Sequence, residues 1–275
     1  MASQVLEKVR VERPAGALGA LVYGLNLSEL TPAVSAQARE LIIEHHVVSF
    51  RGQDLPPRKQ QAFAESLGEL YYHPAVNGLA EAPGLIEVFN TLRGLECFHQ
   101  DSTHSTRPPR FSILAARILP PFGGDTLFAN QHLAFEALSP RLQELLSGLR
   151  AVHKSGEIKK DAEGFQNYSA YQSANEVAVH PVVRTHPDTG RKGLYVNAMY
   201  TKHFEGMTEE ESAPLLSYIY QHVVHPHFTY RHRWQPGDVT VWDNASVQHA
   251  VIADMPEGAK RYMHRATTMD KDPPR

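Results

Sequence analysis

The sequence of 275 residues has a single cysteine, Cys97, and only two tryptophans. It also lacks any run approaching the roughly 18 apolar residues that a membrane span requires. One cysteine excludes an internal disulfide framework and is typical of a reducing compartment. Basic and acidic residues nearly balance, 27 against 30, and no lysine- and arginine-rich block interrupts the chain. Nothing in the charge pattern therefore supports a nucleic-acid or membrane-surface partner. The first residues carry no apolar segment typical of a secretion signal, so we expect a soluble, cytoplasmic protein.

Histidine and proline are abundant, with 16 and 19 residues. Prolines spread along the whole chain suit many short strands joined by turns better than a helical bundle. Helical periodicity is confined to 33–45, 56–70, two short pieces between 132 and 149, and 208–224. Strand-like runs occupy 21–27, 47–53, 84–89, 97–101, 110–119, 125–130, 151–156, 227–234, 238–243 and 262–268, and residues 180–197 read as a hairpin. The pattern predicts one mainly β domain over residues 1–275, a barrel or jelly roll with flanking helices.

Residues 156–178 are polar and weakly periodic. A structureless run of that length inside a compact domain is usually functional. We therefore expect this segment to form a lid.

His99-Gln100-Asp101 is the first pattern that points to chemistry. On a strand, residues i and i+2 share a face, so both side chains would enter the same interior. An imidazole and a carboxylate, with a second imidazole from elsewhere, make the two-His-one-carboxylate triad that holds non-haem Fe(II). A second copy, His186-Pro187-Asp188, falls in the hairpin turn, where proline and aspartate serve turn geometry. We interpret that copy as structural, with Asp188 facing solvent.

The triad needs a distal histidine, and the sequence leaves several open. The candidates are His132, His153, His180, His203, His222, His225, His227, His232, His249 and His264. His225 and His227 also stand at i and i+2, but Pro226 and the basic residues nearby suit an edge strand with solvated side chains. His249 closes "GDVTVWDNASVQHA", where a strand ending in Trp242 turns into the next strand.

Two arginines favour His249. Arg261 and Arg265 share one face of the alternating strand "KRYMHRATT". Two guanidiniums that point into a barrel are costly unless they meet anions there. An arginine offers a fork that matches a carboxylate. We therefore expect an interior with a metal, open coordination positions and fixed positive charge for an anionic ligand.

Five ordered blocks carry a resemblance to a known family: "FHQD", "GGDTLFAN", "HPVVRTHPDTGRKGLYVN", "WDNASVQH" and "RYMHRATT". From "LVYGLNL" to "HRATT", the chain resembles the taurine dioxygenase / 2,4-dichlorophenoxyacetate dioxygenase family of Fe(II)- and 2-oxoglutarate-dependent oxygenases. The resemblance implies a double-stranded β-helix, which is a cupin-like jelly roll, with flanking helices. It also implies that Fe(II), 2-oxoglutarate and O2 are used to hydroxylate a small organic anion, with succinate and CO2 as co-products. By analogy with the family, the chain would form a dimer or tetramer.

Position by position, the resemblance implies that His99, Asp101 and His249 ligate Fe(II). Arg261 would pair with the distal carboxylate of 2-oxoglutarate, assisted by the hydroxyl of Thr126. The other end of the keto acid would chelate the metal.

The resemblance also implies that Trp242 packs near the metal, and that His73 and Arg265 hold the acidic group of the primary substrate. The sequence departs from taurine-specific members at two pocket positions. Val76 replaces an aromatic hydroxyl, and Leu95 replaces an asparagine. The pocket therefore loses polar partners for a small sulfonate and gains apolar surface. We expect a larger or more apolar anion than taurine, such as a sulfate ester, an alkyl or aryl sulfonate, or a phenoxyalkanoate.

Two alternatives compete with this interpretation. One is a cupin-type metalloenzyme that does not use 2-oxoglutarate, such as a cysteine-dioxygenase-like oxygenase or a zinc hydrolase; Arg261 and Thr126 speak against it. The other is a non-catalytic jelly-roll binding protein, which is disfavoured because no ligand position is substituted. Cys97 is interpreted as a small buried thiol without a role.

Overall fold

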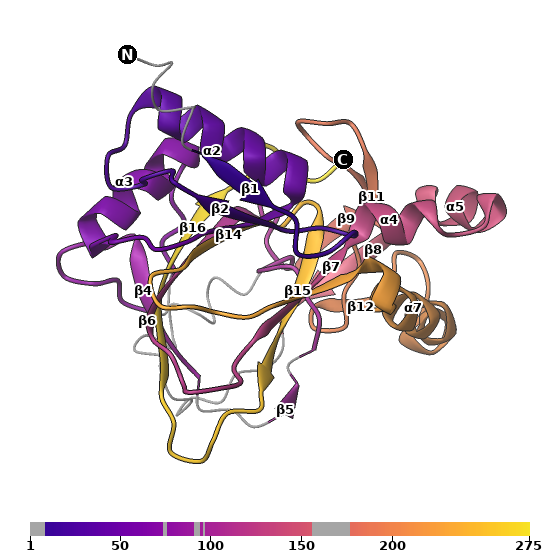
Figure 1. Cartoon of the computed structure of the whole chain (residues 1–275). Coiled ribbons are helices and arrows are strands. Elements are labelled where there is room, and N and C mark those ends of the chain that lie inside the picture. The colour runs from indigo at the N-terminus through magenta and orange to yellow at the C-terminus, as the bar shows by residue number, and fades with distance from the viewer. Residues whose placement is uncertain (1–8, 74–75, 91–93, 96, 156–176) are drawn as a thin grey trace.

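The computed structural model of the chain describes residues 9–73, 76–90, 94–95, 97–155 and 177–275 (Figure 1). Two sheets form its centre. The larger has the order β1 (Arg10–Glu12), β2 (Ala20–Tyr23), β3 (Val47–Phe50), β14 (Val239–Asp243), β6 (Pro109–Ile118), β16 (Arg261–Met269) and β4 (Leu85–Asn90). The smaller has the order β13 (Thr229–His232), β7 (Thr126–Asn130), β15 (Val247–Ala253) and β5 (Gly94–Leu95).

The two sheets face each other across an apolar interior. This cluster joins side chains of the larger sheet with side chains of the smaller one: Val47, Leu114, Trp242 and Met263 with Phe128, Tyr230 and Val247. Strand alternation decides what enters it. On β14, Trp242 packs into this interior, whereas Val239 and Val241 pack on the opposite face, against the helices. The inner faces of β14, β15 and β16 therefore meet in one place.

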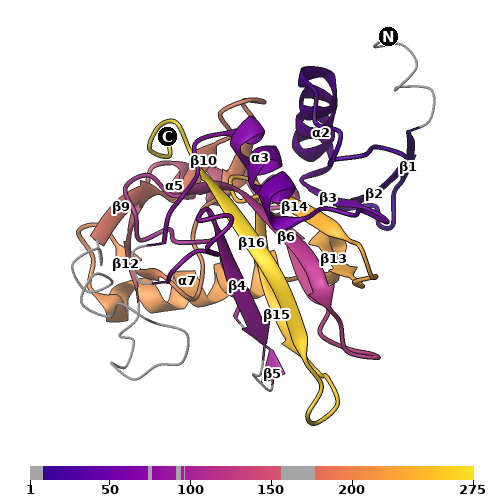
Figure 2. The same ribbon diagram turned by 90° about the vertical axis from the view of Figure 1, so that its left-hand side faces the viewer.

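Helices α2 (Pro32–His45) and α3 (Pro57–Leu67) cover the outer face of the larger sheet through one buried apolar cluster. Figure 2 shows β4, β16 and β6 side by side in this sheet, with α3 packed on it. The start of α2 follows from the sequence, because the Thr31 side chain accepts a hydrogen bond from the Val34 N–H and Pro32 occupies the first turn.

A second apolar cluster lies away from α2 and α3 (Figure 1). Its elements are α4 (Gln131–Glu136), α5 (Pro140–Ser147), α7 (Glu209–Val223), the short helix η1 (Pro226–Phe228), the hairpin β10 (Val183–Thr185) and β11 (Lys192–Leu194), and the sheet β12 (Thr201–Phe204), β8 (Arg150–Lys154) and β9 (Val177–Pro181). Helix α7 begins with a capping box, in which Thr208 and Glu211 bond each other's backbone.

The predicted helices and the long predicted strands are confirmed, but residues 97–101 do not form a regular strand. Only His99 pairs there, in an isolated bridge with His249. Cys97 is exposed, so the prediction of a buried thiol is wrong.

Two other histidine motifs were singled out by the sequence. His225 caps the short helix η1 and His227 lies in it, so the predicted edge strand is wrong there, although both histidines are exposed as expected. Asp188 is exposed as predicted, and it also accepts hydrogen bonds from Arg39 and Arg110.

The expected lid at 156–178 lies outside the described residues except for its last two positions, which begin β9. Both the lid and the single domain over 1–275 stay predictions. Within the described ranges, no helix is long and apolar enough to cross a membrane.

Candidate active site

Three potential metal ligands converge at the mouth of the interior. His99 and His249 exchange backbone hydrogen bonds of 3.0 and 2.8 Å, which bring their ring centres to 4.3 Å. Asp101 Oδ1 lies 3.9 Å from His99 Nε2 and 4.0 Å from His249 Nε2. All three residues are buried, and a ligand atom from each lies within 4.8 Å of the others. Two atoms that bind one ion at about 2.1 Å lie at most about 4.2 Å apart, so these nitrogen–oxygen separations fit a single ion.

Each of the two imidazoles can present a ring nitrogen to a metal. His99 Nδ1 lies 2.9 Å from the Cys97 carbonyl oxygen. Since that oxygen can only accept, Nδ1 donates and Nε2 is free for an ion. Burial lowers the pKa of His249 to about 3, and the nearby His99 adds to the shift. His249 is therefore neutral near pH 7, as a metal ligand must be.

Asp101 is held by a buried hydrogen-bond network that the sequence analysis missed. Ser112 Oγ donates to Asp101 Oδ2 at 2.6 Å, and Asn244 Nδ2 donates to Ser112 Oγ at 3.0 Å. Asn244 Oδ1 in turn accepts from the Asp101 N–H and from Trp242 Nε1, both at 3.2 Å. The "WDNASVQH" block contained Asn244, but nothing in the sequence marked Ser112.

The Asp101 carboxylate is ionised. Burial alone raises its pKa, but His249, Arg265 and His99, together with the hydrogen bond from Ser112, outweigh burial and hold the pKa well below the ordinary value. The site therefore offers two imidazole nitrogens and one negative oxygen, a donor set that suits Fe(II).

Trp242 lies against this cluster. Its ring centre is 4.7 Å from that of His249, and the side chain is buried. Tyr200, which the sequence analysis did not single out, lies on another side, with its ring centre 6.3 Å from His99 and 5.2 Å from His104. Aromatic rings thus border the ligand cluster on two sides.

Arg261 and Thr126 form a second polar group inside the barrel. Arg261 is only 1% exposed, and its Nε donates to the Gly124 carbonyl at 3.0 Å. Thr126 is buried on β7, and its Oγ1 accepts from Trp234 Nε1 at 3.1 Å. The Arg261 guanidinium also lies over the Trp234 ring, with Cζ 5.4 Å from its centre. Trp234 thus contacts both the buried guanidinium and the Thr126 hydroxyl, two groups that can bond a carboxylate.

Two glycines let the backbone approach this group. Gly123 and Gly124 have φ angles of +75° and +69°, which residues other than glycine rarely adopt. A Cβ on Gly124 would lie 3.0 Å from Arg261 Cδ and 3.1 Å from Met255 Sδ. Close packing around Arg261 therefore requires a glycine at 124, whereas at Gly123 a Cβ would lie 2.7 Å from the carbonyl oxygen of Asp254.

The residues expected to hold the substrate are only partly brought to the triad. Arg265 Nη1 lies 3.6 Å from Asp101 Oδ1, and its side chain is 28% exposed. Burial lowers the pKa of His73 to about 4, with smaller contributions from Arg265 and His104, so His73 is neutral near pH 7. Val76 is half-buried, and Leu95 pairs through its backbone with Ile252 of β15. The side chain of Leu95 is outside the described part of the structure.

Comparison with known proteins agrees with this geometry. Residues 10–267 match the family model described as "Taurine catabolism dioxygenase TauD, TfdA family". An alkylsulfatase of Acinetobacter baylyi is 33% identical over 259 residues, which cover 90% of this chain and 81% of the relative. An alpha-ketoglutarate-dependent 2,4-dichlorophenoxyacetate dioxygenase of Cupriavidus pinatubonensis is 34% identical over 262 residues, covering 86% of this chain and 90% of the relative.

Among solved structures, a taurine dioxygenase from Burkholderia xenovorans superposes with a TM-score of 0.84 at 32% identity, covering 97% of this chain and 91% of that one. This likeness confirms the predicted jelly roll with flanking helices. The chain belongs to the TauD/TfdA family of Fe(II)- and 2-oxoglutarate-dependent dioxygenases.

Proposed function

We propose that the chain hydroxylates a small organic anion at the carbon bonded to its sulfonate sulfur, its sulfate-ester oxygen or its ether oxygen. The anion would be a sulfate ester, an alkyl or aryl sulfonate, or an aryloxyalkanoate, and 2-oxoglutarate would be converted to succinate and CO2. The observation that carries this proposal is the buried cluster of His99, Asp101 and His249, which lies next to Arg265 of β16, the strand that also carries the buried Arg261. The names of an alkylsulfatase, a sulfate ester dioxygenase and a 2,4-dichlorophenoxyacetate dioxygenase among the relatives support the substrate class.

In this proposal His99 Nε2, Asp101 and His249 hold Fe(II), which activates O2 with the electrons of 2-oxoglutarate. The protein contributes position and charge. The Cys97 carbonyl sets the tautomer of His99, and Ser112 fixes the Asp101 carboxylate. Trp242 packs against His249 and limits its rotation.

Arg261 and Thr126 bind the distal carboxylate of 2-oxoglutarate. The guanidinium is always charged and almost fully buried, so a carboxylate partner recovers an interaction that water cannot supply there. The Thr126 hydroxyl adds a hydrogen bond from the facing strand β7. This pairing separates the proposal from a metalloenzyme that does without 2-oxoglutarate.

Arg265 and His73 receive the acidic group of the substrate. Arg265 is partly exposed and lies 3.6 Å from Asp101, so it can turn from the carboxylate toward an arriving anion without leaving the site. His73 is neutral, and it offers one N–H donor. Val76 and Leu95 would add apolar surface for the organic part of the substrate. Hydroxylation beside sulfur or oxygen gives an unstable adduct, which breaks that bond to an aldehyde or ketone and releases the heteroatom group.

Oxygen uptake and succinate formation test the proposal across sulfate esters, sulfonates and aryloxy acids. At least one class should stimulate both, with release of sulfate, sulfite or a phenol in equal amount. The anaerobic Fe(II) protein should also develop a weak visible absorption band with 2-oxoglutarate. If no band forms and no substrate consumes 2-oxoglutarate, the proposal is wrong.

Two variants separate the roles of the arginines. Arg261→Ala should weaken the binding of 2-oxoglutarate about 10- to 100-fold, as expected for a lost charged hydrogen bond, and leave the binding of the primary substrate nearly unchanged. Arg265→Ala should do the reverse. Equal effects of both variants on both ligands would contradict the assignment. The expected cytoplasmic location and dimer or tetramer stay predictions.

A further inference from the structure

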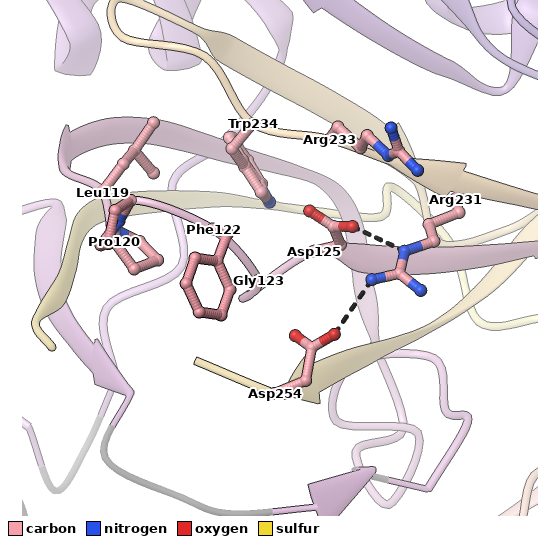
Figure 3. Close-up of a pocket in the computed structure, with 10 residues that line it drawn as sticks. Leu119, Pro120, Phe122, Gly123, Asp125, Arg231, Arg233, Trp234 and Asp254 are labelled. Carbon is pink, nitrogen blue, oxygen red and sulfur yellow. Dashed lines mark hydrogen bonds and ion pairs between the residues drawn. The ribbon is translucent and has the colours of Figure 1, made fainter. Parts of the chain in front are cut away.

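Trp234 connects the two residues assigned to the distal carboxylate. It follows β13 and lies in the wall of a cavity of about 410 Å³ that also includes Phe122, Gly123 and Arg231 (Figure 3). The indole also contacts Thr126 through a hydrogen bond of 3.1 Å, and the Arg261 Cζ lies 5.4 Å from the centre of its ring.

The hydrogen bond decides which way the Thr126 hydroxyl points. A threonine hydroxyl has one hydrogen to donate and two acceptor lone pairs, and an indole N–H can only donate. Trp234 therefore occupies a lone pair of Oγ1 and leaves the hydroxyl hydrogen for an acceptor. Without the indole, the same hydroxyl could accept or donate in other directions.

The ring face also restricts the Arg261 guanidinium. A cation over an indole face is attracted by the ring, and the interaction strengthens when both groups are desolvated. The Nε hydrogen bond to Gly124 fixes one edge of the guanidinium, and Trp234 fixes its face. The guanidinium is therefore held in a defined orientation before any ligand binds, and a preorganised donor loses less entropy on binding.

Trp234 is itself held in place. The ring of His232, which is fully buried, meets the indole at near right angles with ring centres 4.7 Å apart. His232 is bonded at both nitrogens, to the Tyr230 hydroxyl at 3.0 Å and the Thr240 hydroxyl at 3.2 Å. The contact with His232 therefore restricts the position of the indole.

We propose that Trp234 is a positioning residue for 2-oxoglutarate, which orients Thr126 and Arg261 and so makes the site selective for keto acids with a second carboxylate. The inference rests on the proposed function, because it needs Thr126 and Arg261 to receive that carboxylate.

The test compares two keto acids of equal length. 2-Oxoglutarate has the distal carboxylate, and 2-oxopentanoate has a methyl group there. Both dissociation constants are measured by calorimetry on the Zn(II)-loaded protein, so that the readout is binding and not turnover. Trp234→Phe keeps an aromatic face and removes the N–H. It should raise the dissociation constant of 2-oxoglutarate about three- to tenfold and leave that of 2-oxopentanoate unchanged.

The chain offers a matched control, because it has one other tryptophan. Trp242→Phe also removes an indole N–H, in this case one bonded to Asn244. It should change the two dissociation constants by the same factor. Thr126→Val gives a second route to the result, because it should lower the selectivity for 2-oxoglutarate by itself. Trp234→Phe keeps the ring face and removes only the N–H bonded to Thr126. Adding it to Thr126→Val should therefore lower the selectivity much less than it does in the wild type.

The outcomes separate the two proposals. If Trp234→Phe is folded and keeps the wild-type ratio of dissociation constants, or if Trp242→Phe changes that ratio as much, the positioning role is refuted while the proposed function stands. Should Trp234→Phe fail to fold, a wild-type ratio in Thr126→Val would overturn the inference just as well. If the wild-type protein does not prefer 2-oxoglutarate to 2-oxopentanoate, the carboxylate site itself is wrong.

Discussion

Ser112→Ala tests whether the network behind Asp101 holds the metal site together. Ser112 Oγ is fully buried and makes two bonds, one donated to Asp101 at 2.6 Å and one accepted from Asn244 at 3.0 Å. The variant removes a hydrogen bond to a charged group and leaves the Asn244 amide without that acceptor. Together these losses should lower the free energy of unfolding of the metal-free protein by about 2–4 kcal/mol.

The same change should weaken metal binding. The Asp101 carboxylate keeps its negative charge but loses the contact that fixes one oxygen, so the other oxygen is less well aimed at the ion. Loss of such an outer contact typically lowers metal affinity about 10- to 100-fold. Competition with a chromophoric chelator measures the affinity for Fe(II) under anaerobic conditions, and thermal unfolding measures stability.

Ser49→Ala is the matched control. Ser49 is also buried, on β3, and faces Thr240 of β14. Its Oγ accepts a hydrogen bond of 3.1 Å from the Thr240 hydroxyl. Ser112 faces the next inward residue of the same strand, Trp242. Ser49→Ala removes a neutral hydrogen bond and should cost about 1 kcal/mol of stability with no change in metal affinity. The reasoning is refuted if Ser112→Ala binds metal like the wild type, or if Ser49→Ala loses as much affinity.

Three further outcomes follow from the structure. Gly124→Ala should raise the dissociation constant of 2-oxoglutarate, because its Cβ would press on Arg261. Gly190 has a similar φ of +72° but open space around it, so Gly190→Ala should lower stability without changing 2-oxoglutarate binding. Equal losses of binding in the two variants would contradict the packing argument. Asp243→Asn should lower the free energy of unfolding in urea by about 3 kcal/mol, because it removes a buried charge bonded to Arg110 at 2.9 Å; an unchanged midpoint would refute this. Acid should destabilise the protein between pH 6.5 and about 4. Burial lowers the pKa of several histidines to about 3 or 4, so the unfolded chain takes up more protons than the folded protein in this range. The free energy of unfolding, measured by urea titration at several pH values, should fall by on the order of 1 kcal/mol per pH unit for each histidine. These histidines are His46, His132, His153 and His180. A flat stability curve over that window would contradict their buried, neutral state.

The helices and central strands could be predicted because their signals are local. Thr31 and Thr208 mark helix starts through bonds to their own first turns. The buried apolar runs of β6 and β14 need no partner to be recognised. The three exposed residues of β1 carry no such pattern, since pairing with β2 alone makes them a strand. Residues 97–101 mislead for the opposite reason, because local strand character there yields only one bridge.

The candidate site divides in the same way. The metal ligands stood in sequence blocks that a family resemblance could identify, but their meeting depends on the bridge between His99 and His249, which no periodicity encodes. Ser112 and Trp234 were missed because each is an ordinary residue until its partner, Asp101 or Thr126, is placed beside it. A role that depends on a contact between distant segments cannot be read from either segment.

The two His-x-Asp copies show what decides between a ligand pair and a structural pair. In His186-Pro187-Asp188 every useful atom is committed. His186 Nδ1 accepts from the Thr189 N–H at 3.1 Å and Nε2 donates to Asp243 at 2.8 Å, while the Asp188 oxygens bind Arg39 and Arg110 at 2.6 and 2.7 Å. In the first copy, His99 Nε2 and Asp101 Oδ1 have no such hydrogen bond among the described residues, and Arg265 approaches Asp101 no closer than 3.6 Å. A metal ion can therefore bind His99 and Asp101, whereas at His186 and Asp188 it would have to displace two arginines and a buried carboxylate.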